Sequence, residues 1–535
     1  MGALVITALA GLGNAALIGL INVGAESAAQ AEPVGPVMIL IYVCTFGFFY
    51  VANKTSLKEA NRYVQRRLTA LRARVVGKIQ HAPLRALEQI GQGEALAVIA
   101  QETNYLAQNL PLFVSAIQSA FLLAFLLFYI AVLSLPSFLV LVGFTVAGLF
   151  FFWNRRAALD REMGRVHHYE TAMMNGLANF TEGFQEIRLN ADKNDALFRA
   201  FTVVVDELET AVRGVGTRWV VLMEFCNAFL YALAGVVIFV LPMFFDGYTD
   251  VIYKIAAAVI FSLGPVTAIT SATHLYAKAE TGLGHVYRIE KRLDAMTVST
   301  AQSGDGVDLR GFQQIEFQGV TFSYRDDADD AVFTFGPWDF VLRRGEIVFL
   351  VGGNGSGKST ATKLMCGLYR PDAGRIMVDG TEITPSSIQD YRELFAAIFP
   401  DFHLFDRLHG LQDVEPLRVD EMLARMELDT KVTFTNGQFS TTDLSTGQRK
   451  RLAMAAALLE DREIYLFDEW AADQDPHFRE IFYRELLPNL RRQGKTVIAV
   501  THDDRYWSLC DRRLTLDFGT VRSEEAGAID ASRAT

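Results

Sequence analysis

The sequence has little cysteine and little charge, and both shortages exclude classes of protein. Four cysteines in 535 residues are too few for a disulfide framework, and none forms a Cys-x-x-Cys pair or a cysteine–histidine cluster with metal-ligand spacing. Charged residues make up 21% of the chain and hydrophobic residues 51%. With a mean hydropathy of +0.20, this balance excludes a disordered scaffold and argues against a wholly soluble protein.

The two halves of the chain differ in charge. Residues 1–300 contain 23 Lys and Arg against 22 Asp and Glu, so the overall net charge of −11 leaves −12 on the remaining residues. Nucleic acids bind basic surfaces because their phosphates must exchange counterions for positive side chains. We therefore expect no nucleic-acid partner and interpret the acidic half as a solvated exterior.

Several long stretches contain no charge at all. Residues 3–25, 33–53 and 103–154 are uncharged, and Leu135-Pro136-Ser137 indicates a turn inside the third stretch. A helix of roughly 20 apolar residues crosses the hydrocarbon core of a bilayer. The sequence therefore predicts six membrane spans, at residues 3–24, 36–53, 111–133, 137–153, 219–243 and 252–275.

The loops between these spans differ in basic residues. Loops 54–110 and 154–218 each hold nine Lys and Arg, whereas loops 24–35, 134–136 and 244–250 hold none. Basic loops stay on the cytoplasmic side of a membrane. We therefore expect both long loops, and both ends of the membrane segment, in the cytoplasm.

Residues 1–31 permit a second interpretation, as a cleaved signal peptide with Ala29-Gln30-Ala31 as the cleavage site. The basic segment that usually opens a signal peptide is missing, which argues against cleavage, and the question stays open.

Composition also sets the domain boundaries. Apolar residues recur every three or four positions around Leu68, Leu71 and Val75, so we expect helices that extend the spans into the cytosol. Beyond Gly311, short apolar strands alternate with helices, as in α/β domains. The expected organisation is a six-helix transmembrane domain over residues 1–294, a linker over 295–310, an α/β domain over 311–522 and a polar tail over 523–535.

A glycine-rich loop follows the strand expected at residues 346–351. The loop matches the pattern G-x-x-x-x-G-K-S, in which backbone N–H groups surround a triphosphate at the start of a helix. Lys358 is expected to reach the β- and γ-phosphates and Ser359 to bind Mg²⁺. We assign nucleotide binding to Gly352, Gly353, Asn354, Gly355, Ser356, Gly357, Lys358, Ser359 and Thr360.

A second apolar strand, Ile464-Tyr465-Leu466-Phe467, ends in Asp468-Glu469. A carboxylate at a strand end suits a Mg²⁺ ligand, and its neighbour suits a group that orients or deprotonates an attacking water. About a hundred residues after a phosphate-binding loop, the pair predicts Asp468 as a Mg²⁺ ligand and Glu469 as a catalytic residue.

The stretch Asp443-Leu444-Ser445-Thr446-Gly447-Gln448-Arg449 resembles the L-S-G-G-Q signature of ATP-binding-cassette (ABC) proteins. The resemblance implies that Ser445, Gly447 and Gln448 contact the nucleotide held by a second subunit. It implies that Tyr324 stacks on adenine and that His502 contacts the γ-phosphate, with Glu469 and Lys358 as further catalytic residues. One cassette with six spans then resembles a type IV exporter half-transporter that acts as a homodimer.

Three positions depart from the family pattern. Thr446 stands where the signature usually has glycine, and Pro400 or Asp401 stands nearest the position of a usual glutamine. Residues 470–475, Trp-Ala-Ala-Asp-Gln-Asp, replace the more common Pro-Thr-Ser-Ala-Leu-Asp. The string 468–476 is similar to one in bacterial cyclic-peptide exporters, among them exporters of the pyoverdine precursor and of lasso peptides. Residues 183–190 also resemble that group.

The resemblance implies an ATP-driven exporter of a peptide-like substrate in the bacterial inner membrane, with ATP and Mg²⁺ as cofactors. Alternatives are a lipid or multidrug flippase of the same architecture, or a membrane-tethered regulatory ATPase. Residues 82–93 and 176–190 are expected as coupling helices, with ordinary loop helices as the alternative. Within the membrane, Glu224, His274, Gln118 and Asn227 are candidate cavity residues, although Glu224 and His274 also suit helix ends at the membrane interface.

Overall fold

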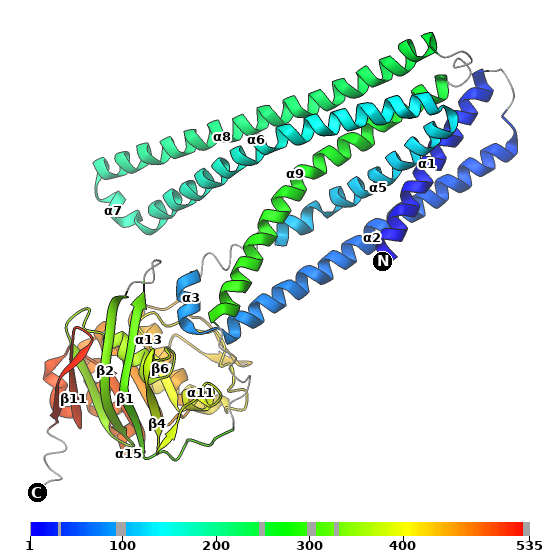
Figure 1. Cartoon of the computed structure of the whole chain (residues 1–535). Helices are drawn as coiled ribbons and strands as arrows, with labels where there is room; N and C mark the ends of the chain where they lie inside the picture. The colour runs from blue at the N-terminus through cyan, green and yellow to red at the C-terminus, as the bar shows by residue number, and fades with distance from the viewer. Residues whose placement is uncertain are drawn as a thin grey trace, which may run out of the picture. The chain divides into compact units, whose positions relative to one another are not determined.

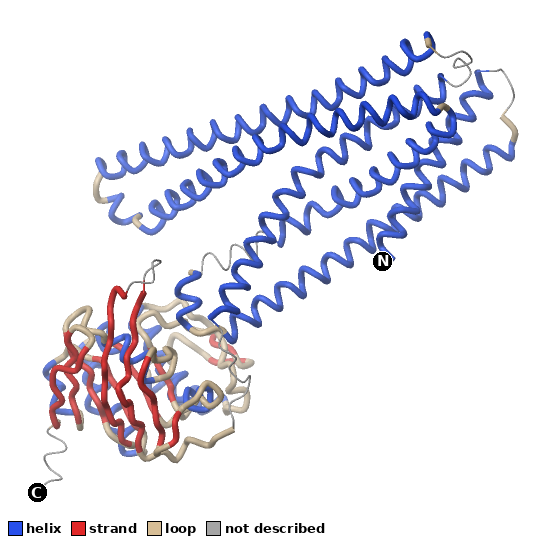
Figure 2. The backbone as a smooth tube through the Cα atoms, in the orientation of Figure 1, coloured by secondary structure: helices blue, strands red, loops and turns tan. Residues whose placement is uncertain are grey.

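The computed structural model describes residues 2–29, 34–91, 103–244, 252–296, 306–325 and 331–527. The chain divides into two compact units. One comprises Met1–Val76 with Gly93–Ile289, and the other comprises Gly77–Gln92 with Glu290–Thr535. Figure 1 traces the chain, and Figure 2 shows that the strands all belong to the second unit. Part of the possible cleavage site, most of the linker and most of the tail lie outside the described residues.

Long helices form the first unit, and two of them, α2 and α9, run on into segments of the second. They extend well beyond the apolar spans, to 46 residues in α2 and 48 in α6, which confirms the expected continuation into polar sequence. The helices are α1 Gly2–Ala29, α2 Pro36–His81, α5 Thr103–Leu133, α6 Leu135–Glu182, α7 Phe184–Arg188, α8 Ala191–Gly235 and α9 Ile252–Met296, with short turns Val236–Val240 and Leu241–Met243 after α8.

Among the residues that the structure describes, five helices are long and apolar enough to cross a membrane. These stretches are Val5–Ser27, Pro36–His81, Thr103–Leu133, Ala191–Met243 and Ile252–Ala295. The span expected at 137–153 corresponds to Leu135–Gly148 in α6, a shorter apolar stretch of the described chain. The six-span topology therefore stays a prediction.

Apolar side chains of the first unit lie both inside and on its surface. A buried cluster joins Leu126 and Ile130 of α5 to Ile255 of α9. Meanwhile α6 and α8 run side by side (Figure 1), with the rings of Phe151 and Phe225 stacked 4.0 Å apart. Phe239 remains 74% exposed, one of many large apolar residues on the surface. An apolar surface of this extent suits contact with lipid.

The second unit contains a six-stranded sheet in the order β12-β11-β3-β10-β9-β6 and a four-stranded antiparallel sheet in the order β2-β1-β4-β5. In the larger sheet only the edge strand β12 is antiparallel. The strands are β1 Gln314–Arg325, β2 Ala331–Arg343, β3 Ile347–Gly352, β4 Ala373–Val378, β5 Thr381–Glu382, β6 Phe395–Ile398, β7 Phe434–Thr435, β8 Gln438–Phe439, β9 Ile464–Asp468, β10 Thr496–Val500, β11 Arg512–Asp517 and β12 Thr520–Ala526.

Helices cover both faces of the larger sheet because its central strands are apolar on both sides. Phe349 of β3 packs into the core with α13, and its neighbours Val348 and Leu350 pack into the core with α10. The helices and helical turns of this unit are α3 Leu84–Ile90, α10 Lys358–Met365, α11 Ile388–Arg392, α12 Pro416–Arg425, α13 Thr446–Leu459, η5 Trp470–Asp473, α14 Pro476–Ile481, η6 Phe482–Leu486, α15 Leu487–Arg492 and η7 Asp504–Leu509.

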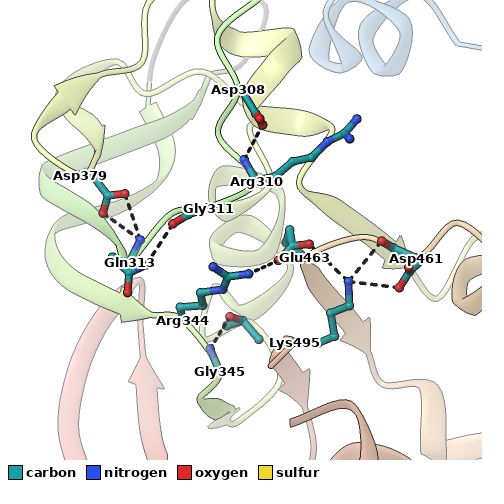
Figure 3. A network of polar contacts seen from close by, with 11 residues as sticks. Asp308, Arg310, Gly311, Gln313, Arg344, Gly345, Asp379, Asp461, Glu463 and Lys495 are labelled. Carbon is teal, nitrogen blue, oxygen red and sulfur yellow. Dashed lines mark hydrogen bonds and ion pairs between the residues drawn. The ribbon is translucent and has the colours of Figure 1, made fainter. Parts of the chain in front are cut away.

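A network of polar contacts holds the amino-terminal ends of the central strands together (Figure 3). Arg344, just before β3, donates to the Glu463 carboxylate at 2.9 Å, and Lys495, just before β10, lies 3.4 Å from the same carboxylate. The ammonium of Lys495 also lies 3.1 Å from Asp461. The opposite, carboxyl-terminal ends of β3, β9 and β10 carry the expected site residues, as is general in open α/β sheets.

Candidate functional site

The glycine-rich loop leaves β3 at Gly352 and enters α10 at Lys358, as the sequence predicts. A Cβ on Gly352 would lie 2.4 Å from the carbonyl oxygen of Leu516, so no side chain fits there. Gly357 has φ of +98°, a conformation that residues other than glycine rarely adopt. These two glycines therefore set the path of the loop.

The loop has the polar groups and the space that an anion requires. A Cβ on Gly353 or Gly355 would meet no atom within 4 Å, so the backbone is open there. The buried hydroxyl of Ser356 has no hydrogen-bond partner among the described residues. Lys358 Nζ donates to the carbonyl oxygens of Gly352 and Gly353 at 3.1 and 2.9 Å. A phosphate fits this loop, since its oxygens would accept hydrogen bonds from the Ser356 hydroxyl and from the Lys358 ammonium.

Two aromatic rings join the loop in one pocket. Its lining comprises Tyr324, Phe333, residues 354–360 and Glu469. Tyr324 and Phe333 are partners in the β1–β2 register, with ring centroids 6.2 Å apart. The sequence argument found Tyr324 and missed Phe333. The strand pairing, which places the two residues opposite each other, is the signal that would have found it.

Asp468 lies at the end of β9 and is only 1% exposed. Thr362 donates a hydrogen bond to Asp468 Oδ2 at 3.3 Å. Burial, followed by the negative charge of Glu469, raises the pKa of Asp468, against hydrogen bonds from Thr362 and Ser359. The two expected Mg²⁺ ligands, Ser359 and Asp468, are therefore neighbours. The described chain holds no group of three His, Cys, Asp or Glu that could bind a metal, so phosphate oxygens would have to complete the set.

Glu469 and His502, both expected to be catalytic, are in contact. His502 Nε2 lies 3.1 Å from Glu469 Oε1, and both side chains are partly exposed to solvent. Glu469 has a positive φ of 51°, and its carbonyl oxygen accepts a hydrogen bond from Lys450 at 3.0 Å. Thus the strand ends of β9 and β10 bring together residues 33 positions apart.

The signature residues begin α13, away from this pocket. Ser445 caps the helix, with its hydroxyl accepting from the Gln448 N–H and the Gln448 side chain accepting from the Ser445 N–H. Thr446, the departure from the family pattern, is exposed in the first turn. Ser445, Gly447 and Gln448 do not line the pocket of the glycine-rich loop in the described chain.

The unusual segment after β9 binds α13 through side chains that the sequence argument did not interpret. Gln474 donates to the carbonyl oxygen of Gly447 at 3.1 Å and accepts from Arg451 at 3.0 Å. Lys450 pairs with Asp473 at 2.7 Å. The indole N–H of Trp470 donates to the carbonyl oxygen of Lys450 at 2.9 Å.

The other departures and membrane candidates lie in varied surroundings. Pro400 and Asp401 are exposed in the turn after β6. Gln118 donates to Asn53 Oδ1 at 2.9 Å, so its amide links two helices rather than being free. Glu224 is exposed, and the side chain of His274 lies outside the described residues.

The two expected coupling segments are only partly helices of their own. Within residues 82–93, α3 spans Leu84–Ile90 and ends at Gly91, and residues beyond 91 are not described. Residues 176–190 do not form one helix. They comprise the end of α6, the short α7 and the start of the turn into α8, because Gly183 and Asn190 interrupt the backbone.

Comparisons with known proteins bear on the whole chain. The family model of the ABC transporters matches residues 335–472. The ATP-binding protein SyrD of Pseudomonas syringae pv. syringae is 33% identical over 489 residues, which cover 87% of this chain and 84% of that protein. The mycobactin import ATP-binding/permease protein IrtB of Mycolicibacterium smegmatis is 30% identical over 281 residues, 47% of this chain and 46% of that protein.

One solved structure matches nearly end to end, that of a bacterial Atm1-family ABC exporter with ATP bound. Its TM-score is 0.79 at 17% identity, with 100% of this chain and 95% of that one covered. This likeness concerns the fold, namely helical membrane segments and an α/β ATPase domain in one chain. Together with the near full-length relative and the family match, it confirms the resemblance drawn from the signature. The chain belongs to the ABC transporters, with the fold of an exporter half-transporter and an ATPase domain that couples ATP hydrolysis to transport.

Proposed function

We propose that the protein is an ATP-driven exporter of a peptide-like substrate, working as a homodimer in the bacterial inner membrane. The observation that carries the dimer is the separation of two half-sites in one chain. The glycine-rich loop and Glu469 line one pocket, whereas Ser445 and Gly447 begin a helix elsewhere. In a homodimer, the start of α13 from each copy would complete the nucleotide pocket of the other copy, as twofold symmetry requires.

The nucleotide would be held by charge and by backbone donors. Lys358 would exchange its two loop carbonyls for phosphate oxygens, and the free hydroxyl of Ser356 and the open backbone at Gly355 face the same space. Tyr324 and Phe333 offer aromatic faces to the base. The start of α13 from the second subunit would add backbone N–H groups near the phosphates.

Hydrolysis would depend on the Asp468-Glu469 pair and His502. Ser359 and Asp468 would hold Mg²⁺, which neutralises phosphate charge when bound. The Glu469 carboxylate accepts a proton from, or orients, the attacking water. His502, 3.1 Å from that carboxylate, keeps it oriented toward the pocket. This intact pair argues against a purely regulatory ATPase, which has no need to complete turnover.

The substrate class rests on the string of residues 468–476 and on the stretch 183–190, both similar to cyclic-peptide exporters. The direction of transport is part of the proposal, since the relatives include a protein named for mycobactin import and one named for macrolide export. A lipid or multidrug flippase is the alternative substrate class with the same mechanism.

The test is transport by purified protein in inside-out proteoliposomes, with cyclic, lasso and linear peptides of similar mass as substrates. We expect ATP-dependent uptake of at least one peptide class, abolished by Glu469→Gln. A macrolide and a fluorescent phospholipid are the comparison substrates. Uptake of these alone would replace the peptide assignment, and ATP hydrolysis without any uptake would overturn transport.

A further inference from the structure

The buried Tyr369 connects α3 with the nucleotide pocket. Tyr369 follows α10, is 2% exposed, and its hydroxyl donates to Glu88 Oε2 of α3 at 2.7 Å. The same hydroxyl oxygen accepts from the Tyr324 hydroxyl at 3.1 Å. Glu88 and Tyr369 are 281 positions apart and belong to the same compact unit. A segment from the membrane half of the sequence therefore reaches, through one side chain, the aromatic residue of the pocket.

Chemistry sets the direction of these hydrogen bonds. An ionised carboxylate only accepts, so the single proton of Tyr369 points to Glu88. Tyr324 must then donate to Tyr369, which leaves the Tyr324 oxygen to accept from Thr360, 3.4 Å away in the first turn of α10. The chain of donors thus runs one way, from Thr360 through Tyr324 and Tyr369 to Glu88. Successive bonds that end on a charge strengthen one another.

The surroundings keep Tyr369 in this arrangement. Its ring stacks on Phe322 with centroids 4.5 Å apart and planes 8° from parallel. Lys363 of α10 lies 2.8 Å from the Glu88 carboxylate and 5.1 Å from the centre of the Tyr369 ring. Burial, and then the hydrogen bonds to Tyr324 and Glu88, raise the pKa of Tyr369, so the hydroxyl keeps its proton and remains a donor.

A second contact holds α3 against the same aromatic cluster. The guanidinium of Arg85 lies 5.3 Å from the centre of the Phe322 ring and 3.9 Å from Asp372. Within the described residues Arg85 contacts Phe322 and Asp372 and forms no hydrogen bond to Tyr324 or Tyr369, so it secures the helix without entering the chain of hydrogen bonds. Both Phe322 and Tyr324 belong to β1, so the two contacts act on one strand.

We propose that Glu88 and Tyr369 are positioning residues that orient the Tyr324 ring for the nucleotide base, so that docking of α3 sets the affinity for ATP. This rests on the proposed function for the identity of the nucleotide. Withdrawal of Glu88 would release the Tyr369 hydroxyl and free Tyr324 to rotate. By reciprocity, a base stacked on Tyr324 favours the docked position of α3 by the same factor.

The experiment measures equilibrium binding of a fluorescent ATP analogue to the full-length protein in nanodiscs. All variants carry Glu469→Gln, so that binding is measured without turnover. Tyr369→Phe keeps the ring and removes the hydroxyl's bonds to Tyr324 and Glu88, together with a 3.3 Å bond from Lys363, and we expect it to weaken binding about fivefold. Glu88→Gln retains an acceptor without the charge, and we expect a loss of about twofold.

Two controls separate positioning from general damage to the core. Tyr391→Phe removes another buried hydroxyl, bonded to the carbonyl oxygen of Met365, and we expect unchanged binding. Inorganic tripolyphosphate, used as a competitor, has no base. Its affinity should therefore be the same in the Tyr369→Phe protein as in its parent.

The outcomes distinguish this inference from the proposed function. Equal ATP affinity in Tyr369→Phe and its parent, or an equal loss of tripolyphosphate affinity, would overturn the positioning role and leave transport untouched. If the parent protein binds ATP and Tyr369→Phe weakens that binding, but the wild-type protein transports no substrate, the positioning role is supported and export is overturned. A weaker ATP affinity with unchanged tripolyphosphate affinity supports the inference.

Discussion

The side-chain amide of Gln474 donates to the carbonyl oxygen of Gly447 at 3.1 Å. This bond joins the segment after β9 to the first turn of α13, which carries the signature. Since Gln474 also accepts from Arg451, one buried side chain fixes the start of the helix against the catalytic strand. Gln474, which belongs to the segment that departs from the usual family sequence, therefore forms a specific contact with the first turn of α13.

Replacing Gln474 by leucine should destabilise the protein by about 1–3 kcal/mol, because it leaves the Arg451 Nε without its Gln474 partner and removes the bond to the Gly447 carbonyl oxygen. We also expect lower ATPase activity, since the start of α13 loses its support. Thermal unfolding and ATP hydrolysis of full-length protein in nanodiscs measure both effects. Gln493→Leu, at an exposed loop position, is the control. Unchanged stability in Gln474→Leu would show that the contact contributes nothing.

Lys450 and Asp473 should behave as a coupled pair. Lys450 is buried, and Asp473 and the Glu469 carbonyl are its oxygen partners. Because Asp473 is half exposed, we expect Asp473→Asn to cost only about 1 kcal/mol. Lys450→Met should cost less in the Asp473→Asn background than in the wild type. A double-mutant cycle on unfolding free energies measures the difference, and strict additivity would contradict a direct interaction.

Glu469→Gln should lower the rate of ATP hydrolysis about a hundredfold or more and leave ATP binding intact. The physical reason is the loss of the group that orients or deprotonates water, while the loop that holds the phosphates is unchanged. Steady-state hydrolysis and equilibrium binding together test this. Glu463→Gln is a matched control at the opposite end of β9, where the carboxylate pairs with Arg344. If both variants hydrolyse ATP normally, another base is required.

Two inactive variants should restore activity when mixed. Lys358→Ala disables the glycine-rich loop, and Ser445→Arg blocks the start of α13. In a mixed dimer one composite site carries both defects and the other carries neither. The purified mixed dimer should then retain about half of wild-type hydrolysis if the two sites are independent. Tagged co-expression and sequential purification provide the mixed dimer. Its complete inactivity would contradict independent composite sites.

Asp475 provides a test of pH dependence. The Phe478 N–H, and then the charge of Arg451, lower the pKa of this carboxyl below its ordinary value of about 4. A carboxyl whose pKa is lower in the folded protein than in the unfolded protein stabilises the fold at pH values above its unfolded-state pKa. This contribution is lost as the pH falls through the folded-state pKa. The stability difference between wild type and Asp475→Asn should thus be constant from about pH 8 to 5 and shrink below about pH 4.

Thermal unfolding followed by tryptophan fluorescence measures this difference. Asp420→Asn, an exposed position on α12, is the control and should show no difference at any pH. A stability difference between wild type and Asp475→Asn that grows as the pH falls would contradict the lowered pKa of Asp475.

Local sequence was sufficient for the loop, its strand and its helix. An apolar run followed by glycines, lysine and serine specifies β3 and the start of α10 because each step depends on neighbouring residues. The Ser445–Gln448 cap is likewise local, since the two side chains are one helical turn apart. For the same reason, the extension of α2 beyond its apolar span followed from the helical spacing around Leu68, Leu71 and Val75.

Other residues could not be predicted because their role depends on distant partners. Phe333 enters the pocket only through its pairing with Tyr324, and Gln474 matters only because it lies against Gly447. The expected helix at 176–190 was wrong as a single element, since Gly183 and Asn190 change the direction of the backbone there.

The sequence by itself determined the class of chemistry, because phosphate binding and catalysis use residue types at short, fixed spacing. Only the tertiary structure decided which side chains complete and adjust that chemistry. Glu88 meets Tyr369, and His502 meets Glu469, because strand ends and a docked helix bring together groups that the chain separates widely. The physical reason is that packing selects long-range neighbours by shape and burial, which one-dimensional spacing does not record.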